Sequence, residues 1–181
     1  MAHLLTGVRL LAVVPAAWAF SRPDGVSVWV LVALMTVAIV TDYYDGVVAR
    51  RSGTASARGM LFDHTTDCLF VTAGLAGAAF AGLVPALLPV LVVVAFTQYV
   101  LDSYFLHRQK QLRMSTLGRW NGVLYFAPLV QIALARLEWL PALADLAGAV
   151  VRPFSIVLVV STVASIADRA AAPLRARASV R

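Results

Sequence analysis

Long apolar stretches separated by short polar segments run along the whole chain. Several of these stretches approach the roughly 20 apolar residues that span a bilayer. Their pattern predicts six helices, at about residues 4–20, 26–48, 60–82, 85–106, 120–140 and 150–170. The polar segments between them, such as 50–59 and 107–119, predict loops. We therefore expect an all-α integral membrane protein whose six transmembrane helices form one bundle.

Composition supports this prediction. Of the 181 residues, 61% are hydrophobic, whereas a soluble domain is usually about 45–50% apolar. The connecting segments are too short to hold a second domain, so we expect residues 1–181 to form a single membrane domain. The arginine-rich end, about residues 170–181, is expected to be a flexible tail.

The basic residues gather in alternate predicted loops. Twelve fall on one side, namely Arg9, Arg50, Arg51, Arg58, Arg108, Lys110, Arg113, Arg119, Arg169, Arg175, Arg177 and Arg181. Three fall on the other side, namely Arg22, Arg136 and Arg152. Because cytoplasmic loops carry the excess of Lys and Arg, this bias predicts a multi-pass protein of the inner (cytoplasmic) membrane with both termini cytoplasmic. The net charge of +6 is then explained by this topology and by contact of the arginines with anionic lipid head groups of the bilayer. No nucleic-acid partner is expected.

Four acidic residues stand between apolar stretches, where a membrane helix normally has none. They are Asp42, Asp45, Asp63 and Asp67. A carboxylate at membrane depth is costly and marks a functional site. Residues three or four apart share a helix face, so each pair points one way and the two pairs can converge across an antiparallel helix pair. Carboxylate oxygens suit Mg²⁺ or Mn²⁺, which predicts a pair of divalent cations here. His64 is expected on a different face from Asp63 and Asp67, where it would either orient a ligand through its ring or be a bystander.

Three alternatives compete with a metal site. The acids could form a structural salt-bridge network with the nearby arginines, Arg50, Arg51 and Arg58. They could line the ion path of a transporter or channel, although both pairs lie at one predicted end and no inverted repeat is evident. The chain could also be an inactive scaffold, although all four acids are present. A salt-bridge network does not account for the small residues among the acids, which are Gly46, Ala49 and Gly59.

The spacing of these residues resembles the signature of the CDP-alcohol phosphatidyltransferase family. The chain reads Asp42-x2-Asp45-Gly46-x2-Ala49-Arg50-x8-Gly59-x3-Asp63-x3-Asp67, and every defined position of the signature is present. Six helices, a cytoplasmic site and the stretch Leu5-Thr6-x2-Arg9 agree with the family more loosely.

The resemblance implies metal-dependent transfer of a phosphatidyl group from a CDP-alcohol, most simply CDP-diacylglycerol, to an acceptor hydroxyl, with release of CMP. It implies that two divalent cations, Mg²⁺ or Mn²⁺, are held by Asp42, Asp45, Asp63 and Asp67, and that Asp67 is also the general base. It implies a nucleotide site formed by Gly46, Ala49, Arg50 and Gly59, with Thr6 as a further candidate. Family members commonly form homodimers, and the small residues of the third predicted helix suit either a dimer or internal packing.

The acceptor is less well defined by the sequence. The basic loop and its neighbours offer Arg108, Lys110, Arg113, Arg119 and Asp102 as acceptor-binding candidates. Arginine can bind phosphate with two parallel hydrogen bonds, so a phosphorylated acceptor is one possibility and a non-phosphorylated alcohol another. The same basic residues could instead only set topology, and Asp102 could pair with Arg108 or Arg113. The Gly118-Arg119 pair is followed by Trp120-Asn121, where part of the family has Lys-Thr.

Overall fold

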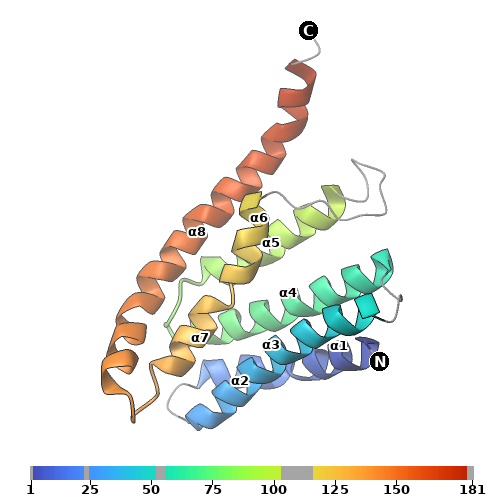
Figure 1. Cartoon of the computed structure of the whole chain (residues 1–181). Helices are drawn as coiled ribbons and strands as arrows, with labels where there is room; N and C mark the ends of the chain where they lie inside the picture. Colours follow the sequence, from blue (N-terminus) through green and yellow to red (C-terminus); the bar gives the residue numbers. More distant parts are fainter. Residues whose placement is uncertain (1, 23–24, 52–55, 103–115, 179–181) are drawn as a thin grey trace.

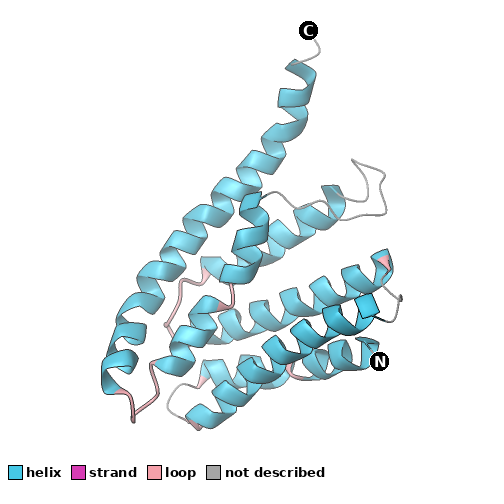
Figure 2. Cartoon of the chain, in the orientation of Figure 1, coloured by secondary structure: helices cyan, strands magenta, loops and turns pink. Residues whose placement is uncertain are grey.

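A computed structural model of the protein describes residues 2–22, 25–51, 56–102 and 116–178. These residues form helices joined by turns and short loops, with no strand among them (Figure 2). The all-α prediction is therefore confirmed for this part of the chain. The predicted loop 107–119 lies largely outside the described residues.

The described residues contain eight helices rather than six. They are α1 (Ala2–Leu11), α2 (Val13–Ser21), α3 (Val28–Arg51), α4 (Ala57–Phe80), α5 (Leu87–Leu101), α6 (Thr116–Leu124), α7 (Ala127–Leu134) and α8 (Pro141–Ala178). The difference arises because two predicted helices are each divided. The stretch predicted at about 4–20 forms α1 and α2, and the stretch at about 120–140 forms α6 and α7.

Proline explains both divisions. A proline ring lacks an N–H and clashes with the carbonyl four residues before it, so a helix is interrupted on its N-terminal side. Pro15 lies four residues after Leu11, where α1 ends, and Pro128 lies four residues after Leu124, where α6 ends. At the first division the backbone N–H of Ala12 is shared between the carbonyls of Val8 and Arg9, each 3.1 Å away.

The last helix is longer than the sequence predicts. It begins at Pro141, since proline is favoured in the first turn of a helix, so the gap expected between the predicted helices 120–140 and 150–170 is helical and Arg152 lies within α8. It also continues to Ala178, through much of the stretch predicted to be a flexible tail. Figure 1 shows that its C-terminal part projects beyond the other helices.

The first four helices bring one end of the bundle together. Helix α2 packs along α4, whereas α1 packs against both α3 and α4. The C-terminal end of α3 and the N-terminal end of α4 therefore lie close to α1 and to the N-terminus (Figure 1). The side chain of Ser56 caps α4 by accepting a hydrogen bond of 3.0 Å from the backbone N–H of Gly59.

Glycine allows α2 and α4 to pack at close range. A Cβ atom on Gly77 would overlap the carbonyl oxygen of Ala17 and lie 3.0 Å from the backbone nitrogen of Ser21. A Cβ on Gly74 would lie 2.9 Å from a methyl carbon of Leu129. These two small residues of α4 therefore serve packing within the chain, one of the two uses that the sequence suggested.

The exterior of the bundle is strongly apolar. Large apolar side chains are exposed on several helices, among them Leu11, Val14, Phe80, Val123 and Val160. Among the described residues, one helical segment, Pro141–Ala171, is long and apolar enough to cross a membrane. Three other apolar helical segments are shorter, namely Thr6–Ser21, Val28–Tyr44 and Leu87–Leu101. Six spanning helices therefore remain a prediction.

Replacing Gly77 with valine should separate α2 from α4. The added side chain meets backbone rather than a flexible side chain, so we expect destabilisation of about 1–3 kcal/mol, the usual cost of overpacking. Thermal unfolding of the purified protein in detergent measures the effect. Gly148→Ala is the control, because its new Cβ would meet only the Cβ of Ala135 at 3.7 Å. Equal melting temperatures for Gly77→Val and wild type would contradict the close packing of the two helices.

Candidate active site at the acidic ends of α3 and α4

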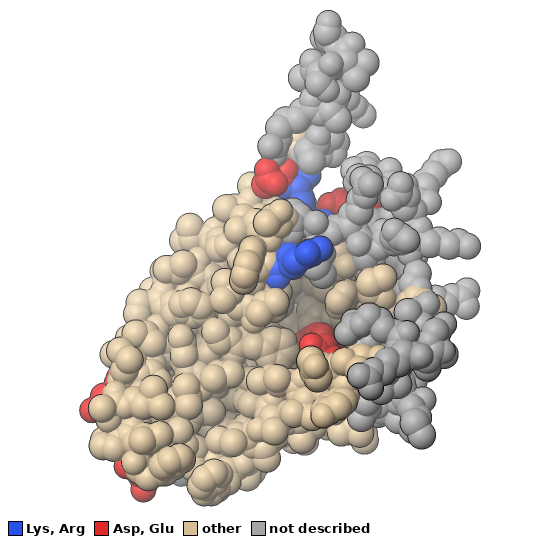
Figure 3. Space-filling view, in the orientation of Figure 1, with Lys and Arg blue, Asp and Glu red and all other residues tan. Residues whose placement is uncertain are grey.

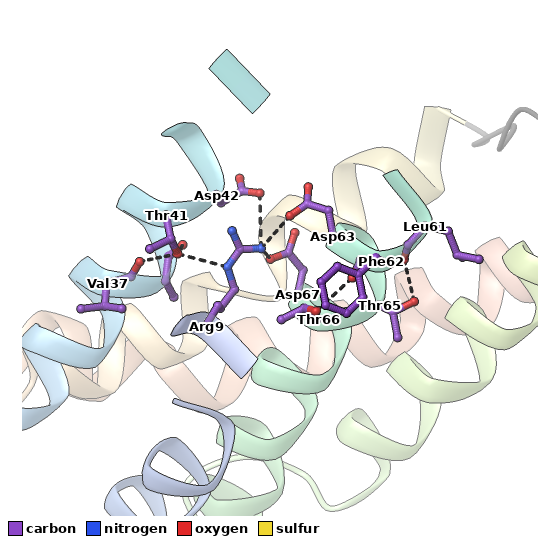
Figure 4. Close-up of polar contacts among 11 residues, drawn as sticks. Arg9, Val37, Thr41, Asp42, Leu61, Phe62, Asp63, Thr65, Thr66 and Asp67 are labelled. Atoms are coloured by element: carbon purple, nitrogen blue, oxygen red, sulfur yellow. Dashed lines mark hydrogen bonds and ion pairs between the residues drawn. The ribbon is translucent and has the colours of Figure 1, made fainter. Parts of the chain in front are cut away.

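Three of the four predicted acids meet at one end of the bundle. Asp42 lies in the last part of α3, and Asp63 and Asp67 lie in the first part of α4. Their carboxylates point toward one another across the helix pair (Figure 4). Asp45 also lies in α3, but its side chain is outside the described part of the structure. The predicted convergence is therefore observed for Asp42, Asp63 and Asp67.

A buried arginine lies at the centre of this group. The guanidinium of Arg9 reaches from α1 between α3 and α4 (Figure 4) and is 0% exposed. Its Nη1 atom lies 3.1 Å from Asp63 Oδ1 and 3.7 Å from Asp42 Oδ1, and it donates a short hydrogen bond to Asp67 Oδ1. One nitrogen is thus shared by oxygens from three carboxylates.

The other side of the guanidinium is held by a threonine. Arg9 Nε donates to Thr41 Oγ1 at 3.3 Å, and both residues are buried. The Thr41 hydroxyl in turn donates to the backbone carbonyl of Val37 at 2.7 Å, the usual hydrogen bond of a threonine within a helix. Arg9 is therefore fixed by α3 as well as by the acids, which removes much of its freedom to change rotamer.

The acids differ in how far they reach water. The side chain of Asp42 is 51% exposed, whereas those of Asp63 and Asp67 are 24% and 21% exposed. An ion pair is screened less where water is excluded, so the contacts of Arg9 with Asp63 and Asp67 are stronger than its contact with Asp42.

The donor atoms at the start of α4 suit a divalent metal. One oxygen each from Asp63 and Asp67 and one ring nitrogen of His64 lie within 4.8 Å of one another. The two carboxylates suit Mn²⁺ or Mg²⁺, and none of these three groups is a thiolate of the kind that soft metals prefer. The interpretation of His64 as lying on a different face from Asp63 and Asp67 is wrong, because its ring nitrogen lies beside their oxygens.

A cavity of about 750 Å³ adjoins the acids. Apolar side chains from α4, α5, α6 and the turn between α6 and α7 form most of its wall, among them Val71, Val92, Val123 and Phe126, whereas α8 contributes Ser165 and Arg169. Asp67 and His64 contribute to the wall at the acidic end, and Arg119 and Arg169 bring positive charge to it. Figure 3 shows the visible face hollowed between acidic and basic side chains, with mostly uncharged surface around them.

The predicted nucleotide-binding residues are only partly described. Thr6 is buried in α1, one turn before Arg9. Gly59 lies in the first turn of α4, where its N–H bonds Ser56. Gly46, Ala49 and Arg50 fall in α3, but their surroundings lie outside the described part, as do the side chains of Arg51 and Arg58. A network with those arginines is therefore not tested.

Of the predicted acceptor-binding residues, too, only some lie in the described part of the structure. Arg119 is exposed in α6 and lines the cavity. Arg108, Lys110 and Arg113 lie outside the described residues. Asp102, at the end of α5, forms an ion pair of 3.5 Å with Arg169 of α8, and its predicted pairing with Arg108 or Arg113 falls outside the described residues.

Two arginines of this region were missed by sequence reasoning. Arg9 was taken as a topology signal and as part of the stretch Leu5-Thr6-x2-Arg9, although it interrupts the apolar run of the first helix and a lone charge there must find a buried partner. Arg169 was assigned to the cytoplasmic charge, yet its guanidinium pairs with Asp102 and lies over the ring of Tyr99, 5.3 Å from the centroid. The contact spans α5 and α8, which sequence spacing does not link.

Comparison with known proteins gives one clear match. The model of a family described as CDP-alcohol phosphatidyltransferase matches residues 1–170. The match covers nearly the whole chain and confirms the resemblance that the acidic motif carries. No curated protein and no solved structure matches the chain significantly.

Replacing His64 with leucine should change metal preference. Mn²⁺ accepts an imidazole nitrogen more readily than Mg²⁺ does, because Mg²⁺ is a hard cation that prefers oxygen ligands. We therefore expect His64→Leu to weaken Mn²⁺ binding about tenfold or more, within the range of losses seen when a metal site is altered, and to affect Mg²⁺ much less. Electron paramagnetic resonance of free Mn²⁺, with Mg²⁺ as competitor, measures both affinities. An equal loss for the two metals would argue against a His64–metal bond.

Proposed function

The chain belongs to the CDP-alcohol phosphatidyltransferase family, and from that premise we propose that it transfers a phosphatidyl group from CDP-diacylglycerol to an acceptor alcohol, releasing CMP. Members of this family are membrane-embedded, metal-dependent transferases that use a CDP-alcohol donor and an alcohol acceptor. The single observation that carries the proposal is the convergence of Asp42, Asp63 and Asp67 at the end of an apolar cavity.

We assign metal binding to the four aspartates, Asp42, Asp45, Asp63 and Asp67. Their oxygens suit two divalent cations, Mg²⁺ or Mn²⁺, which when bound would neutralise charge on the donor diphosphate and on the leaving phosphate of CMP. The close approach of the Asp63 and Asp67 oxygens supports this assignment.

The cytidine diphosphate of the donor is proposed to be held by Arg50, Gly46, Ala49, Gly59 and Thr6. Arg50 would contact the phosphates.

Asp67 is proposed to be the general base. In the transfer, the acceptor oxygen forms a bond to the phosphorus of the phosphatidyl group as the bond from that phosphorus to the CMP oxygen breaks. The proton of the acceptor hydroxyl passes to a carboxylate oxygen of Asp67, and CMP leaves with the electron pair of the broken bond. This role is supported by the position of Asp67 in the cavity wall, where it is open to a substrate.

The acceptor is proposed to approach from the basic side of the cavity. Arg119 and Arg169 both line this cavity, and a phosphorylated alcohol would find its charge partners there. Arg108, Lys110 and Arg113 are further candidates from the basic loop. Asp102 would act indirectly, by holding Arg169 in place through their ion pair. A non-phosphorylated alcohol, or a CDP-alcohol other than CDP-diacylglycerol, is the alternative within the same chemistry.

We further propose a multi-pass location in the inner membrane, with both termini cytoplasmic, and a homodimer. The location is supported by the apolar exterior and by the family. With the acids at the cytoplasmic end, a lipid donor in the bilayer and a water-soluble acceptor could both reach them.

Replacing Asp67 with asparagine should abolish turnover. The amide keeps the size of the side chain but cannot accept the proton, so we expect CMP release to fall about a hundredfold or more. The assay uses purified protein in detergent, labelled CDP-diacylglycerol, Mn²⁺ and a panel of alcohols and phospho-alcohols. Asp145→Asn is the matched control, because Asp145 is exposed and lies far along the chain in α8.

Each outcome of this assay is informative. Metal-dependent CMP release with one acceptor supports the proposed activity and identifies that acceptor. Retained turnover in folded Asp67→Asn would remove Asp67 from the base role. Metal-dependent ion flux into vesicles with no CMP release from any acceptor would favour a transporter instead.

A further inference from the structure

Arg9 has no role in the transfer as proposed, although it is the most buried charged group at the site. We propose that Arg9 is a resident counter-charge that occupies the oxygen atoms of the metal site and thereby weakens metal binding until the donor arrives. This inference rests on the proposed metal site. It makes Arg9 a positioning residue, because its effect on substrate passes through the aspartates.

The contacts of Arg9 resemble those of a bound cation. A guanidinium usually binds a carboxylate through two parallel hydrogen bonds. Here one nitrogen, Nη1, faces Oδ1 atoms of Asp42, Asp63 and Asp67 together. Two of these residues, Asp63 and Asp67, also form the group that could hold a metal ion. The guanidinium and a metal ion therefore need the same oxygens.

The charge balance explains why the arginine is present. Three carboxylates close to one guanidinium leave a net charge of about minus two among these side chains. Without Arg9 the same carboxylates would repel one another with no positive group between them, and buried like charges are strongly destabilising. With Arg9, the protein can fold before any metal binds.

The same charge opposes the metal. A dication that approaches Asp63 and Asp67 meets a fixed positive group within a few ångströms, which cannot retreat easily because Thr41 holds its Nε atom. Two dications on four aspartates, with Arg9 still present, would leave the site positively charged. The anionic diphosphate of the donor would balance that charge. The protein should therefore bind the metal more tightly when the donor is bound, and the donor more tightly when the metal is bound.

Mn²⁺ binding to the full-length protein without substrate tests this role. We compare wild type, Arg9→Gln and Arg9→Lys by electron paramagnetic resonance, and we follow thermal unfolding in chelator and in saturating Mn²⁺. Arg22→Gln is the matched control, because Arg22 is exposed and lies at the end of α2 remote from the acids.

Arg9→Gln is expected to bind Mn²⁺ about tenfold more tightly than wild type, or more, a gain of ~1.4 kcal/mol. It should melt at a lower temperature than wild type in chelator, and Mn²⁺ should recover the difference. Arg9→Lys retains the charge and should keep the weaker affinity of the wild type. Arg22→Gln should match wild type in both measurements.

Unchanged or weaker Mn²⁺ binding by Arg9→Gln would overturn the proposal, since Arg9 would then support the ligands rather than oppose the metal. Recovery of folded Arg9→Gln only when Mn²⁺ is present during purification would support it, because the metal then replaces the lost charge. Failure to recover it even with Mn²⁺ would overturn it. No substrate is used, so absence of CMP release from the wild type would refute the proposed function and leave this result intact.

Discussion

A buried positive charge among three carboxylates constrains how α1, α3 and α4 are arranged at the end of the bundle that carries the acids. Arg9 lies on α1, Asp42 on α3, and Asp63 and Asp67 on α4. A buried charge is tolerated only when it is paired, so the three helices must end at one place and in one rotational register. A slip of any of them by one residue would turn its charge toward apolar surroundings. The ion pairs thus specify the arrangement of the helices.

The packing away from the site makes this arrangement possible. Helix α2 packs along α4, and α1, on the other side of the division near Pro15, contacts both α3 and α4. Gly77 then lets the backbones of α2 and α4 approach, which fixes where α4 lies. The close packing of α2 on α4 therefore helps to hold α1, which precedes α2 and carries Arg9, at the ends of α3 and α4.

The spacing of the acids along the chain predicted which of them share a helix face. It did not predict which basic residues form ion pairs with them. The interval from Asp63 to Asp67 sets a shared helix face, and the apolar stretches on either side predict the helices themselves. Arg9 and Asp67 are far apart in sequence, and their contact depends on how the helices cross. The pair Asp102–Arg169 was missed for the same reason. Helix ends near Pro15, Pro128 and Pro141 were mispredicted because apolar periodicity continues across them.

The apolar cavity changes the electrostatic environment of the acids that lie beside it. The wall formed by α4, α5, α6 and α8 excludes water from one side of Asp67, which strengthens every electrostatic contact that Asp67 makes. A fully enclosed set of acids would be too costly to keep ionised, and a fully exposed set would be screened by salt. Asp42, which is half exposed, keeps the group in contact with water, whereas Asp63 and Asp67 extend it into the bundle. A substrate with a charged head and apolar chains would meet both environments at this boundary, so the position of the acids at the rim of the cavity supports the proposed lipid donor.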